Sequence, residues 1–400
     1  MKSTLKILVL GLVDVASITQ SANKAGHSVY TIDLFGDLDT KKYSERSLSI
    51  LQEYGKIPLK DLEISGAFLK LTKKLMKENN IDAILLASGL DDECQLLQSL
   101  HDLVPILGNE PEKIESVRNK HHFFNELRKL RIQFPETKFV NNLNEGLLAS
   151  KDIGFPLVIK PTKGYGGIGI RMCDGKKDLQ DFLNDKPDGE WIIQERIAGT
   201  PASVSIIADG SKSKILTLNE QLLGVKEFGQ KEEFRFSGNI VPLEATEDLM
   251  QRCEELTNKI VAKFGLKGSN GIDLIISDRS DEIKIIEVNP RFQATLECIE
   301  RYLGINLVNL HLKACDHVEL PTNLNKPQSK FIGRGILYSK SNIKIPNLIK
   351  YDFARDIPNS GLEIPEGEPL CSVITDSSSR DKCLQEAKNY AKMIYDEVIQ

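Results

Sequence analysis

The chain has 400 residues, and its 52 basic and 57 acidic side chains leave a formal net charge of −5. This length exceeds one ordinary domain and predicts two or three. The acidic balance disfavours a protein held on nucleic acid by phosphate neutralisation, although a local basic patch would be compatible with it, and no apolar run approaches the ~18 residues that cross a bilayer.

Cysteine and histidine usage disfavours a structural metal site or a disulfide framework. The seven cysteines form no C-x-x-C pair and their number is odd, which favours reduced thiols in a cytoplasm. His121-His122 is the only local histidine cluster, so isolated core or surface histidines are a simpler interpretation than a zinc enzyme. The apolar run 7–13 is interrupted by Gly11 and stopped by Asp14, and we interpret it as a buried strand rather than a signal peptide.

The first hundred residues alternate between strand and helix patterns. Strands are predicted at 6–10, 28–32 and 83–87, and helices at 18–25 and 64–77. This order is typical of a parallel α/β sheet, whose ligands lie at the carboxyl ends of the strands. Gly11, Asp33 and the segment 88–93 therefore lie near a candidate site, although a turn or helix-cap role is the simpler interpretation of Asp33. The first turn lacks G-x-G-x-x-G, which disfavours a dinucleotide site.

The pattern changes at about Asn109. One charged helix is predicted at 111–130, with Lys120 midway along it. Strands and tight turns follow, then a helix, a strand pair, a proline-containing linker and a short tail. The predicted strands are 157–160, 168–172, 191–195, 203–208, 215–218, 271–277, 283–289, 333–338 and 370–374; the helices are 249–264 and 380–398; and the linker is 322–329.

A glycine-rich loop is the most informative motif. The strand 157–160 ends at Lys160, and Lys163 opens a loop that carries Gly164, Gly166, Gly167 and Gly169. Glycines let backbone amides approach phosphate oxygens closely. Strands flank the loop on both sides, so it is neither a Walker loop nor a dinucleotide loop, both of which open into a helix. A lysine at the entrance of such a loop suits a flap over a triphosphate, although a simple hairpin turn also uses glycine.

The strands on either side of residue 280 predict a set of hard oxygen ligands. If Ile275 pairs with Ile285, Asp273 lies opposite Glu287, and the alternation of a strand places Asn289 on the same face. Two carboxylates and an amide suit Mg²⁺, because triphosphate and water supply its remaining ligands. Exposed polar positions on an amphipathic sheet are the alternative. Arg291 continues this face past Pro290, and a fixed cation there suits a transferring phosphoryl group.

A third, weaker signal lies at the end of the strand 191–195. The strand turns at Gly199, and the unpaired backbone groups of a strand end can bind the edge of an adenine. An ordinary strand end is an equally good interpretation.

Taken together in this order and spacing, Lys120, Lys160, the glycine loop, the segment 194–199 and Asp273…Glu287-x-Asn289-x-Arg291 resemble the ATP-grasp superfamily up to about residue 320. Within it, the chain is similar to predicted ATP-dependent carboligases related to pyrrolysine-pathway and tyramine–glutamate ligases. The tail resembles the small carboxy-terminal lobe of the biotin carboxylase and purine-pathway carboxylase branch. The resemblance implies an α/β chain with a parallel pre-domain at 1–109, an ATP-grasp domain at 110–321 with a flap at about 135–196, and a small α+β lobe at 330–400.

The resemblance also implies roles for these residues. Lys120 and Lys160 would contact ATP phosphates, Lys163 and the loop glycines would cover them, and Gln194, Glu195 and Ile197 would lie at the adenine. Asp273, Glu287 and Asn289 would hold one or two Mg²⁺ or Mn²⁺ ions, with Arg291 and Lys160 as catalytic residues. The family commonly has an acidic residue for the ribose shortly after the position of Gly199. This chain reads Thr-Pro-Ala-Ser there, so the ribose contact must come from elsewhere or the nucleotide binds more weakly.

The implied activity is an ADP-forming ligase that activates a small-molecule carboxylic acid as an acyl phosphate for attack by an amine or similar nucleophile. The alternatives are a bicarbonate-activating carboxylase and a nucleotide-binding regulatory module without turnover. The expected setting is the cytoplasm, without a nucleic-acid or membrane partner, and a homodimer is compatible with the sequence. The acid, the nucleophile and the role of the carboxy-terminal lobe are not encoded in any motif that we can interpret.

Overall fold

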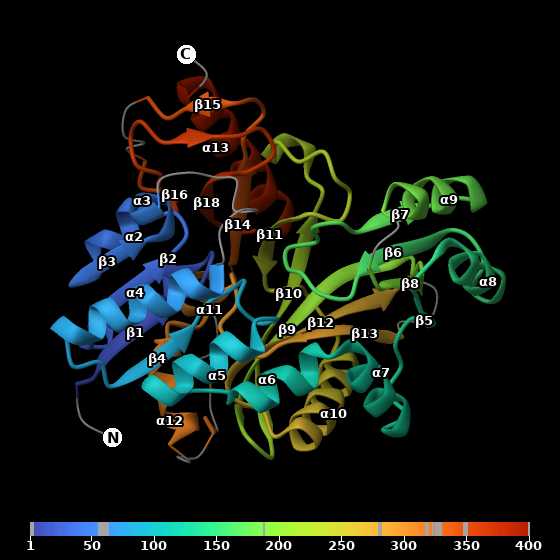
Figure 1. The fold of residues 1–400 in the computed structure, drawn as a ribbon, viewed down its shortest axis with the longest axis horizontal. Helices are drawn as coiled ribbons and strands as arrows, with labels where there is room; N and C mark the ends of the chain where they lie inside the picture. Colours follow the sequence, from blue (N-terminus) through green and yellow to red (C-terminus); the bar gives the residue numbers. More distant parts are fainter. Residues whose placement is uncertain are drawn as a thin grey trace.

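The computed structural model describes residues 4–54, 64–186, 189–278, 282–316, 320–321, 324, 330–346 and 351–398. The described chain has a parallel sheet at the amino terminus, a small antiparallel sheet that projects to the opposite side, and a large antiparallel sheet between them (Figure 1). This arrangement confirms the predicted mixed α/β class. The boundaries proposed for the individual domains stay predictions.

The amino-terminal unit is a four-stranded parallel sheet in the order β3-β2-β1-β4. Helices cover it, so the central strand β1 is apolar on both faces, and the four residues 7–10 are fully buried. Asp33 is the last residue of β2, and its Oδ1 accepts a hydrogen bond from the Gly36 N–H in the following turn at 2.6 Å. The elements are β1 Lys6–Leu10, α1 Val15–Lys24, β2 Ser28–Asp33, α2 Leu38–Lys42, β3 Arg46–Ser49, α3 Ile50–Tyr54, α4 Ile64–Glu78, β4 Ala83–Leu86 and α5 Cys94–Leu103.

The single helix predicted at 111–130 is wrong. The structure has two helices, α6 Pro111–Arg118 and α7 Lys120–Lys129, which meet at Asn119. Asn119 has an extended ψ of 99°, and its side chain accepts a hydrogen bond from the His122 N–H at 3.0 Å, as an N-cap does. Lys120 therefore stands at the first turn of a helix, and Arg118 stands at the last turn of the preceding one.

The flap is a four-stranded antiparallel sheet in the order β5-β8-β6-β7, with two helices against it, and it projects on the right of Figure 1. The predicted strand at 168–172 begins later, at Arg171, because the glycine loop runs on to Ile170 without pairing to a neighbouring strand. The elements are β5 Thr137–Val140, α8 Leu143–Ile153, β6 Leu157–Pro161, β7 Arg171–Cys173, α9 Lys176–Asp185 and β8 Trp191–Glu195.

The central sheet has eight strands in the order β13-β12-β9-β10-β11-β14-β18-β16. Strand β14 comes from the tail and pairs with β11, so the carboxy-terminal strands extend the same sheet. Most of the predicted linker at 322–329 lies outside the described residues. The strands are β9 Gly199–Asp209, β10 Ser213–Leu223, β11 Phe236–Val241, β12 Lys267–Ser277, β13 Ile283–Asn289, β14 Phe331–Tyr338, β16 Ala354–Arg355 and β18 Pro369–Ser377.

Helices cover this sheet and the tail closes one end of it (Figure 1). Helix α13 packs on β14 and β18 and encloses a separate apolar cluster with Phe228, Leu337 and Ile394. The remaining elements are the 3-10 helix η2 Lys226–Phe228, α10 Glu247–Phe264, α11 Leu296–Leu303, α12 Leu307–Cys315, β15 Ile343–Lys344, β17 Glu363–Ile364 and α13 Arg380–Val398.

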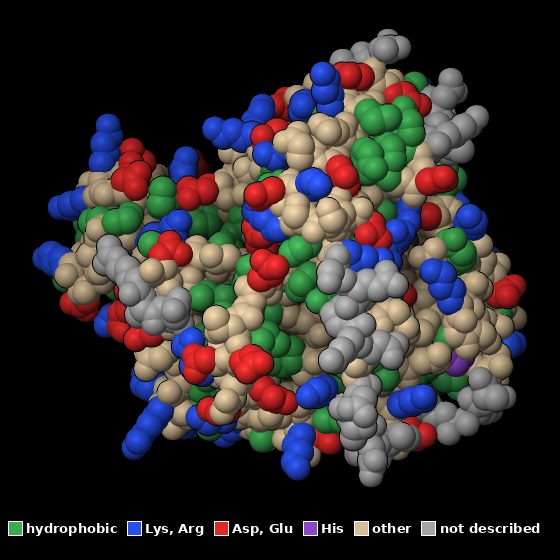
Figure 2. Space-filling view, turned by 180° about the vertical axis from the view of Figure 1, so that it is seen from behind, with side chains coloured by type: hydrophobic (Ala, Val, Ile, Leu, Met, Phe, Trp, Pro, Cys, Tyr) green, Lys and Arg blue, Asp and Glu red, His purple; other side chains and the backbone are tan. Residues whose placement is uncertain are grey.

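The state of the cysteines and the distribution of surface charge are those expected from the composition. All seven cysteines are free thiols. Acidic and basic side chains are interspersed over the face seen in Figure 2. Of the helices in the described part of the chain, none has the length and apolar character of a membrane span.

The seam between β11 and β14 yields a test of this sheet order. Gly238 has φ +132°, and a Cβ added there would overlap the carbonyl oxygen of Arg334 on β14. We expect Gly238→Ala to lower the free energy of unfolding by roughly 3 kcal/mol, through left-handed strain and overpacking together. Gly361→Ala is the matched control, because Gly361 also has positive φ but no atom lies within 4 Å of its added Cβ. Urea unfolding of both variants should give a clearly smaller loss for the control, of about 1 kcal/mol; equal losses would contradict the packed seam.

Candidate active site

A cavity of about 580 Å³ lies where the glycine loop, the central sheet and the amino-terminal unit meet. Thirteen of the fourteen predicted site residues line it, and Gly169, which is also described, lies outside the lining. Those that line it are Lys120, Lys160, Lys163, Gly164, Gly166, Gly167, Gln194, Glu195, Ile197, Asp273, Glu287, Asn289 and Arg291.

Asp273, Glu287 and Asn289, which we call the oxygen-ligand face, lie together on β12 and β13, although the predicted register is wrong beyond Asp273. Asp273 pairs with Glu287, but Leu274, not Ile275, pairs with Ile285. A β-bulge after Asp273 absorbs one residue, so the strands on its far side pair one step out of phase with the predicted register. The bulge could not be foreseen from alternation alone.

Asp273 and Asn289 offer the oxygen atoms that a hard cation needs. The Asn289 amide donates to Asp273 Oδ2 at 3.0 Å, whereas Asp273 Oδ1 is buried and has no partner among the described residues. A buried carboxylate oxygen left unpaired, beside a second carboxylate and an amide, fits Mg²⁺. In the described ranges no group of three or more His, Cys, Asp or Glu residues is placed to hold a metal ion, so this amide would have to serve as the third ligand.

Two cations hold Glu287 in its charged form. Lys120 Nζ lies 2.8 Å from Glu287 Oε2, and Arg118 Nη1 lies 3.7 Å from the same oxygen. Burial opposes the charge, but these neighbours keep the pKa of Glu287 well below its usual range. Burial, followed by the repulsion of Glu287, raises the pKa of Asp273 to about 7. The two carboxylates thus lie in contrasting environments on one face.

Lys160 enters the cavity from the end of β6. It is 8% exposed, and burial, followed by the charge of Lys120, lowers its pKa to about 8, against the attraction of Glu287. A lysine so destabilised as a cation gains a partner when an anionic phosphate binds beside it.

The glycine loop lies over the cavity between β6 and β7. Gly167 has φ +77°, and a Cβ there would overlap the carbonyl oxygen of Phe234, so only glycine fits this close approach. The Gly166 carbonyl accepts from the Phe236 N–H at 3.1 Å, which ties the loop to β11.

Several polar groups at the strand end of the predicted adenine site already form hydrogen bonds within the protein. Gln194 donates from Nε2 to Thr137 Oγ1 at 2.8 Å, and the Glu195 N–H donates to the Glu136 carbonyl at 2.9 Å. The Ile197 carbonyl accepts from the Arg196 guanidinium. All three predicted residues still line the cavity, and their adenine contacts stay a prediction.

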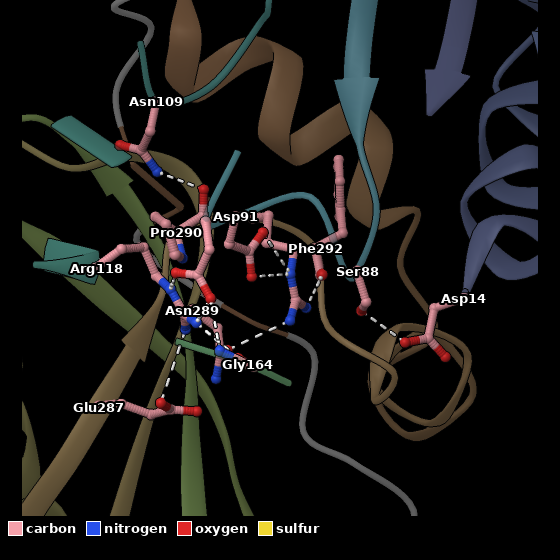
Figure 3. A network of polar contacts seen from close by, with 12 residues as sticks. Asp14, Ser88, Asp91, Asn109, Arg118, Gly164, Glu287, Asn289, Pro290 and Phe292 are labelled. Carbon is pink, nitrogen blue, oxygen red and sulfur yellow. Dashed lines mark hydrogen bonds and ion pairs between the residues drawn. The ribbon is translucent and has the colours of Figure 1, made fainter. Parts of the chain in front are cut away.

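A polar network that the sequence analysis missed ties the amino-terminal unit to this face (Figure 3). Arg291 donates through Nε to both carboxylate oxygens of Asp91, at 2.9 and 3.1 Å, and through Nη2 to Asn289 Oδ1 at 3.3 Å. Asp92 accepts from Arg118. The predicted site segment 88–93 contained both aspartates, but no pattern indicated their partners.

The far end of the cavity carries a second charged group. Arg334 on β14 is 4% exposed and donates to Asp356 Oδ2 at 2.5 Å, with Asp14 at 3.4 Å. Its Nε, and the Nδ2 of the fully buried Asn239 directly opposite on β11, have no hydrogen-bond partner among the described residues. Two adjacent buried donors in a cavity wall suit an oxygen acceptor supplied by a ligand.

The comparisons with known proteins agree with this geometry. The family model described as the ATP-grasp domain matches residues 117–295. The chain carries an ATP-grasp domain. This finding confirms the predicted superfamily, and the matched range holds every cation and oxygen ligand of the predicted phosphate site.

Two sequence relatives extend the similarity beyond the ATP-grasp domain. An uncharacterized protein of Methanocaldococcus jannaschii is 28% identical over 92% of this chain and 88% of its own length. The carbamoyl phosphate synthase large chain of Pseudothermotoga lettingae is 25% identical over 70% of this chain, which spans only 24% of that larger protein.

Two solved structures show the same fold over nearly the whole chain. Biotin carboxylase from Campylobacter jejuni has a TM-score of 0.74 at 16% identity, with 95% of this chain and 89% of that one covered. L-amino acid ligase from Bacillus licheniformis has a TM-score of 0.71 at 15% identity, with 97% of both covered. At these identities the likeness shows the fold alone, and one neighbour is named a carboxylase and the other a ligase.

The lowered pKa of Lys160 predicts a pH dependence of nucleotide binding. Bound phosphate favours the charged lysine, so affinity is fullest below pH 8 and falls as the pH rises through that value. We expect an ATP analogue with Mg²⁺ to bind roughly tenfold more weakly at pH 9.5 than at pH 7. Calorimetry on wild type and Lys160→Arg checks this, because arginine stays charged and should flatten the profile; parallel profiles would remove Lys160 from the phosphate site.

The oxygen-ligand face gives a second test. Glu287→Gln removes the charge that attracts a divalent cation, so Mg²⁺-dependent ATP turnover should fall by roughly 100-fold or more. Glu282→Gln is the control, because Glu282 precedes the same strand but lies at the surface beside Lys284. ADP release at saturating Mg²⁺ measures both variants. Activity retained by Glu287→Gln would exclude this carboxylate from the site.

Proposed function

We propose that the protein is an ATP- and Mg²⁺-dependent ligase that converts a carboxylic acid into an acyl phosphate, which an amine or similar nucleophile then attacks. The observation that carries the proposal is the position of Arg291. This buried cation lies between the oxygen-ligand face and the segment leading to Ala294, whose carbonyl accepts from Arg334 at 2.9 Å. A cation at that point would face a group in transfer between the two ends of the cavity, which supports the proposal.

The two halves of the reaction use different parts of the cavity. A substrate carboxylate oxygen attacks the γ-phosphorus, the bond to the bridging oxygen breaks, and ADP leaves. The nucleophile then attacks the acyl carbon, loses a proton, and releases phosphate with the substrate oxygen attached. Lys120 and Lys160 would neutralise the phosphates, and Arg291 would stabilise the transferring group.

Mg²⁺ bound by Asp273, Glu287 and Asn289 would neutralise further charge on the phosphate oxygens. The chain's own residues supply the positioning. Asp91 fixes the plane of the Arg291 guanidinium through two hydrogen bonds, and the Gly167 backbone brings the loop over the phosphate end.

The acid would lie toward the far end of the cavity. Arg334 Nε and Asn239 Nδ2 are donors there without a partner in the described part of the chain, and they suit an oxygen of the acid substrate. Asp14 and Asp356 already neutralise Arg334, so this end also suits an amine. The identity of acid and amine stays open within these classes.

A bicarbonate-activating carboxylase is the second candidate. The observation that favours it is the tail, whose strands β14 and β18 extend the central sheet, together with a TM-score of 0.74 to a biotin carboxylase over 95% of the chain. Carboxylase activity would use the same phosphate site but would need no organic acid for ADP release.

We further propose that the enzyme acts in the cytoplasm on small molecules. Seven free thiols, five of them buried, support a reducing setting.

Oxygen tracing separates the two reactions. After a metabolite screen identifies an acid that stimulates ADP release, we expect ¹⁸O in its carboxylate to appear as one labelled oxygen per phosphate, because the carboxylate attacks phosphorus and the later step breaks the carbon–oxygen bond. Mass spectrometry of the phosphate measures the label, with Glu287→Gln as the inactive control. Label from water would indicate simple hydrolysis, and label from bicarbonate without any acid would establish the carboxylase.

A further inference from the structure

A closed ring of charge-assisted hydrogen bonds joins the glycine loop to the amino-terminal unit. The Gly164 N–H donates to Asp92 Oδ2 at 2.8 Å, and the Gly164 carbonyl accepts from Arg118 Nη2 at 2.8 Å. The same guanidinium binds both oxygens of Asp92, through Nε and Nη2, each at 2.8 Å. Three residues from separate parts of the chain thus form hydrogen bonds with one another (Figure 3 shows Arg118 and Gly164).

The ring is shielded from water. The Arg118 side chain is 4% exposed and that of Asp92 is 17% exposed. Charge-assisted hydrogen bonds gain strength in such surroundings, and an arginine that binds a carboxylate with two parallel bonds also fixes its orientation.

The next two loop residues are anchored as well. Tyr165 packs against the apolar core of the amino-terminal unit, and Gly166 accepts from Phe236 on β11. By contrast, Ile168 at the middle of the loop is 44% exposed. The contacts therefore lie at the first half of the loop and involve both the amino-terminal unit and the central sheet.

Arg118 also reaches the oxygen-ligand face. Its Nη1 lies 3.7 Å from Glu287 Oε2, on the opposite side of the guanidinium from the bonds to Asp92. One side chain therefore relates the position of the loop to that of the predicted metal ligand.

We propose that Asp92 and Arg118 are positioning residues that hold the glycine loop closed over the phosphate end of the cavity, so that closure depends on the amino-terminal unit. The consequence for chemistry rests on the proposed function: a loop held in place excludes water from the acyl phosphate, and a loosened loop lets water compete with the nucleophile.

Hydrogen exchange of the full-length protein without nucleotide tests the ring directly. Asp92→Ala removes both the acceptor of the Gly164 N–H and the partner of Arg118, so amides at 163–170 should exchange roughly tenfold faster than in wild type. Asp102→Ala is the matched control, because Asp102 lies on α5 of the same unit and is bound by Gln98 on the same helix. The proposal is overturned if 163–170 exchanges at the wild-type rate, or if the increase spreads evenly over the strands of the amino-terminal unit, as general destabilisation would produce.

A second variant keeps the proposal testable if Asp92→Ala does not fold. Arg118→Lys keeps a cation near Glu287 but cannot bridge two acceptors with a planar fork, so it should loosen the same loop residues. If Arg118→Lys folds and its amides at 163–170 exchange at the wild-type rate, the proposal would also be overturned.

Turnover then tests the consequence. With a known acid and nucleophile, ADP formed per ligated product should stay near one in wild type and Asp102→Ala, and rise at least twofold in Asp92→Ala. An unchanged ratio would overturn the water-exclusion role. If no acid stimulates ADP release in wild type, the proposed function fails. The hydrogen-exchange result still decides whether Asp92 and Arg118 hold the glycine loop closed.

Discussion

The site depends on two cations that compensate the charge of one partly buried carboxylate, that of Glu287. Glu287 lies on β13, an edge strand of the central sheet, in surroundings where an unpaired charge would be costly, and Lys120 and Arg118 reach it from the ends of two different helices. The helix break at Asn119 makes this geometry possible, since it brings residues two positions apart to the same oxygen from separate helix termini. A continuous helix would direct these two side chains about 200° apart.

The amino-terminal unit contributes to the same site through adjacent aspartates. Asp91 and Asp92 follow the buried strand β4, where parallel sheets present their functional residues. One binds Arg291 at the end of β13 and the other binds Arg118 and the glycine loop. The amino-terminal sheet thereby fixes two parts of the ATP-grasp domain, because each of these two aspartates pairs with an arginine of that domain.

Local patterns in the sequence were sufficient to predict most strands and the residues that line the end of the cavity beneath the glycine loop. Alternation identified β13 to the residue, and the glycine spacing located the loop, because both signals depend on neighbours in the chain. The bulge after Asp273 and the break at Asn119 were missed, since each shifts the pattern by a single residue and is decided by tertiary contacts. Arg118, Asp91 and Asp92 were not assigned partners, because their bonds join segments 26 to 200 residues apart.

The charges around the cavity indicate what nucleotide binding must change. At the phosphate end, Lys120 is bound to Glu287, Arg291 to Asp91 and Arg118 to Asp92, so three of the cations already have carboxylate partners. Among the residues that the structure describes, no carboxylate forms an ion pair with Lys160, and its pKa is lowered, so it is the cation that would gain most from a bound phosphate. If Glu287 binds a metal ion as proposed, its Oε2, which Lys120 binds here, becomes available when Lys120 exchanges this carboxylate for a phosphate oxygen. On the proposed function each exchange replaces one ion pair by another, so nucleotide and metal together would leave no charge in the cavity unpaired. A metal ion alone would instead meet a carboxylate oxygen that Lys120 already binds.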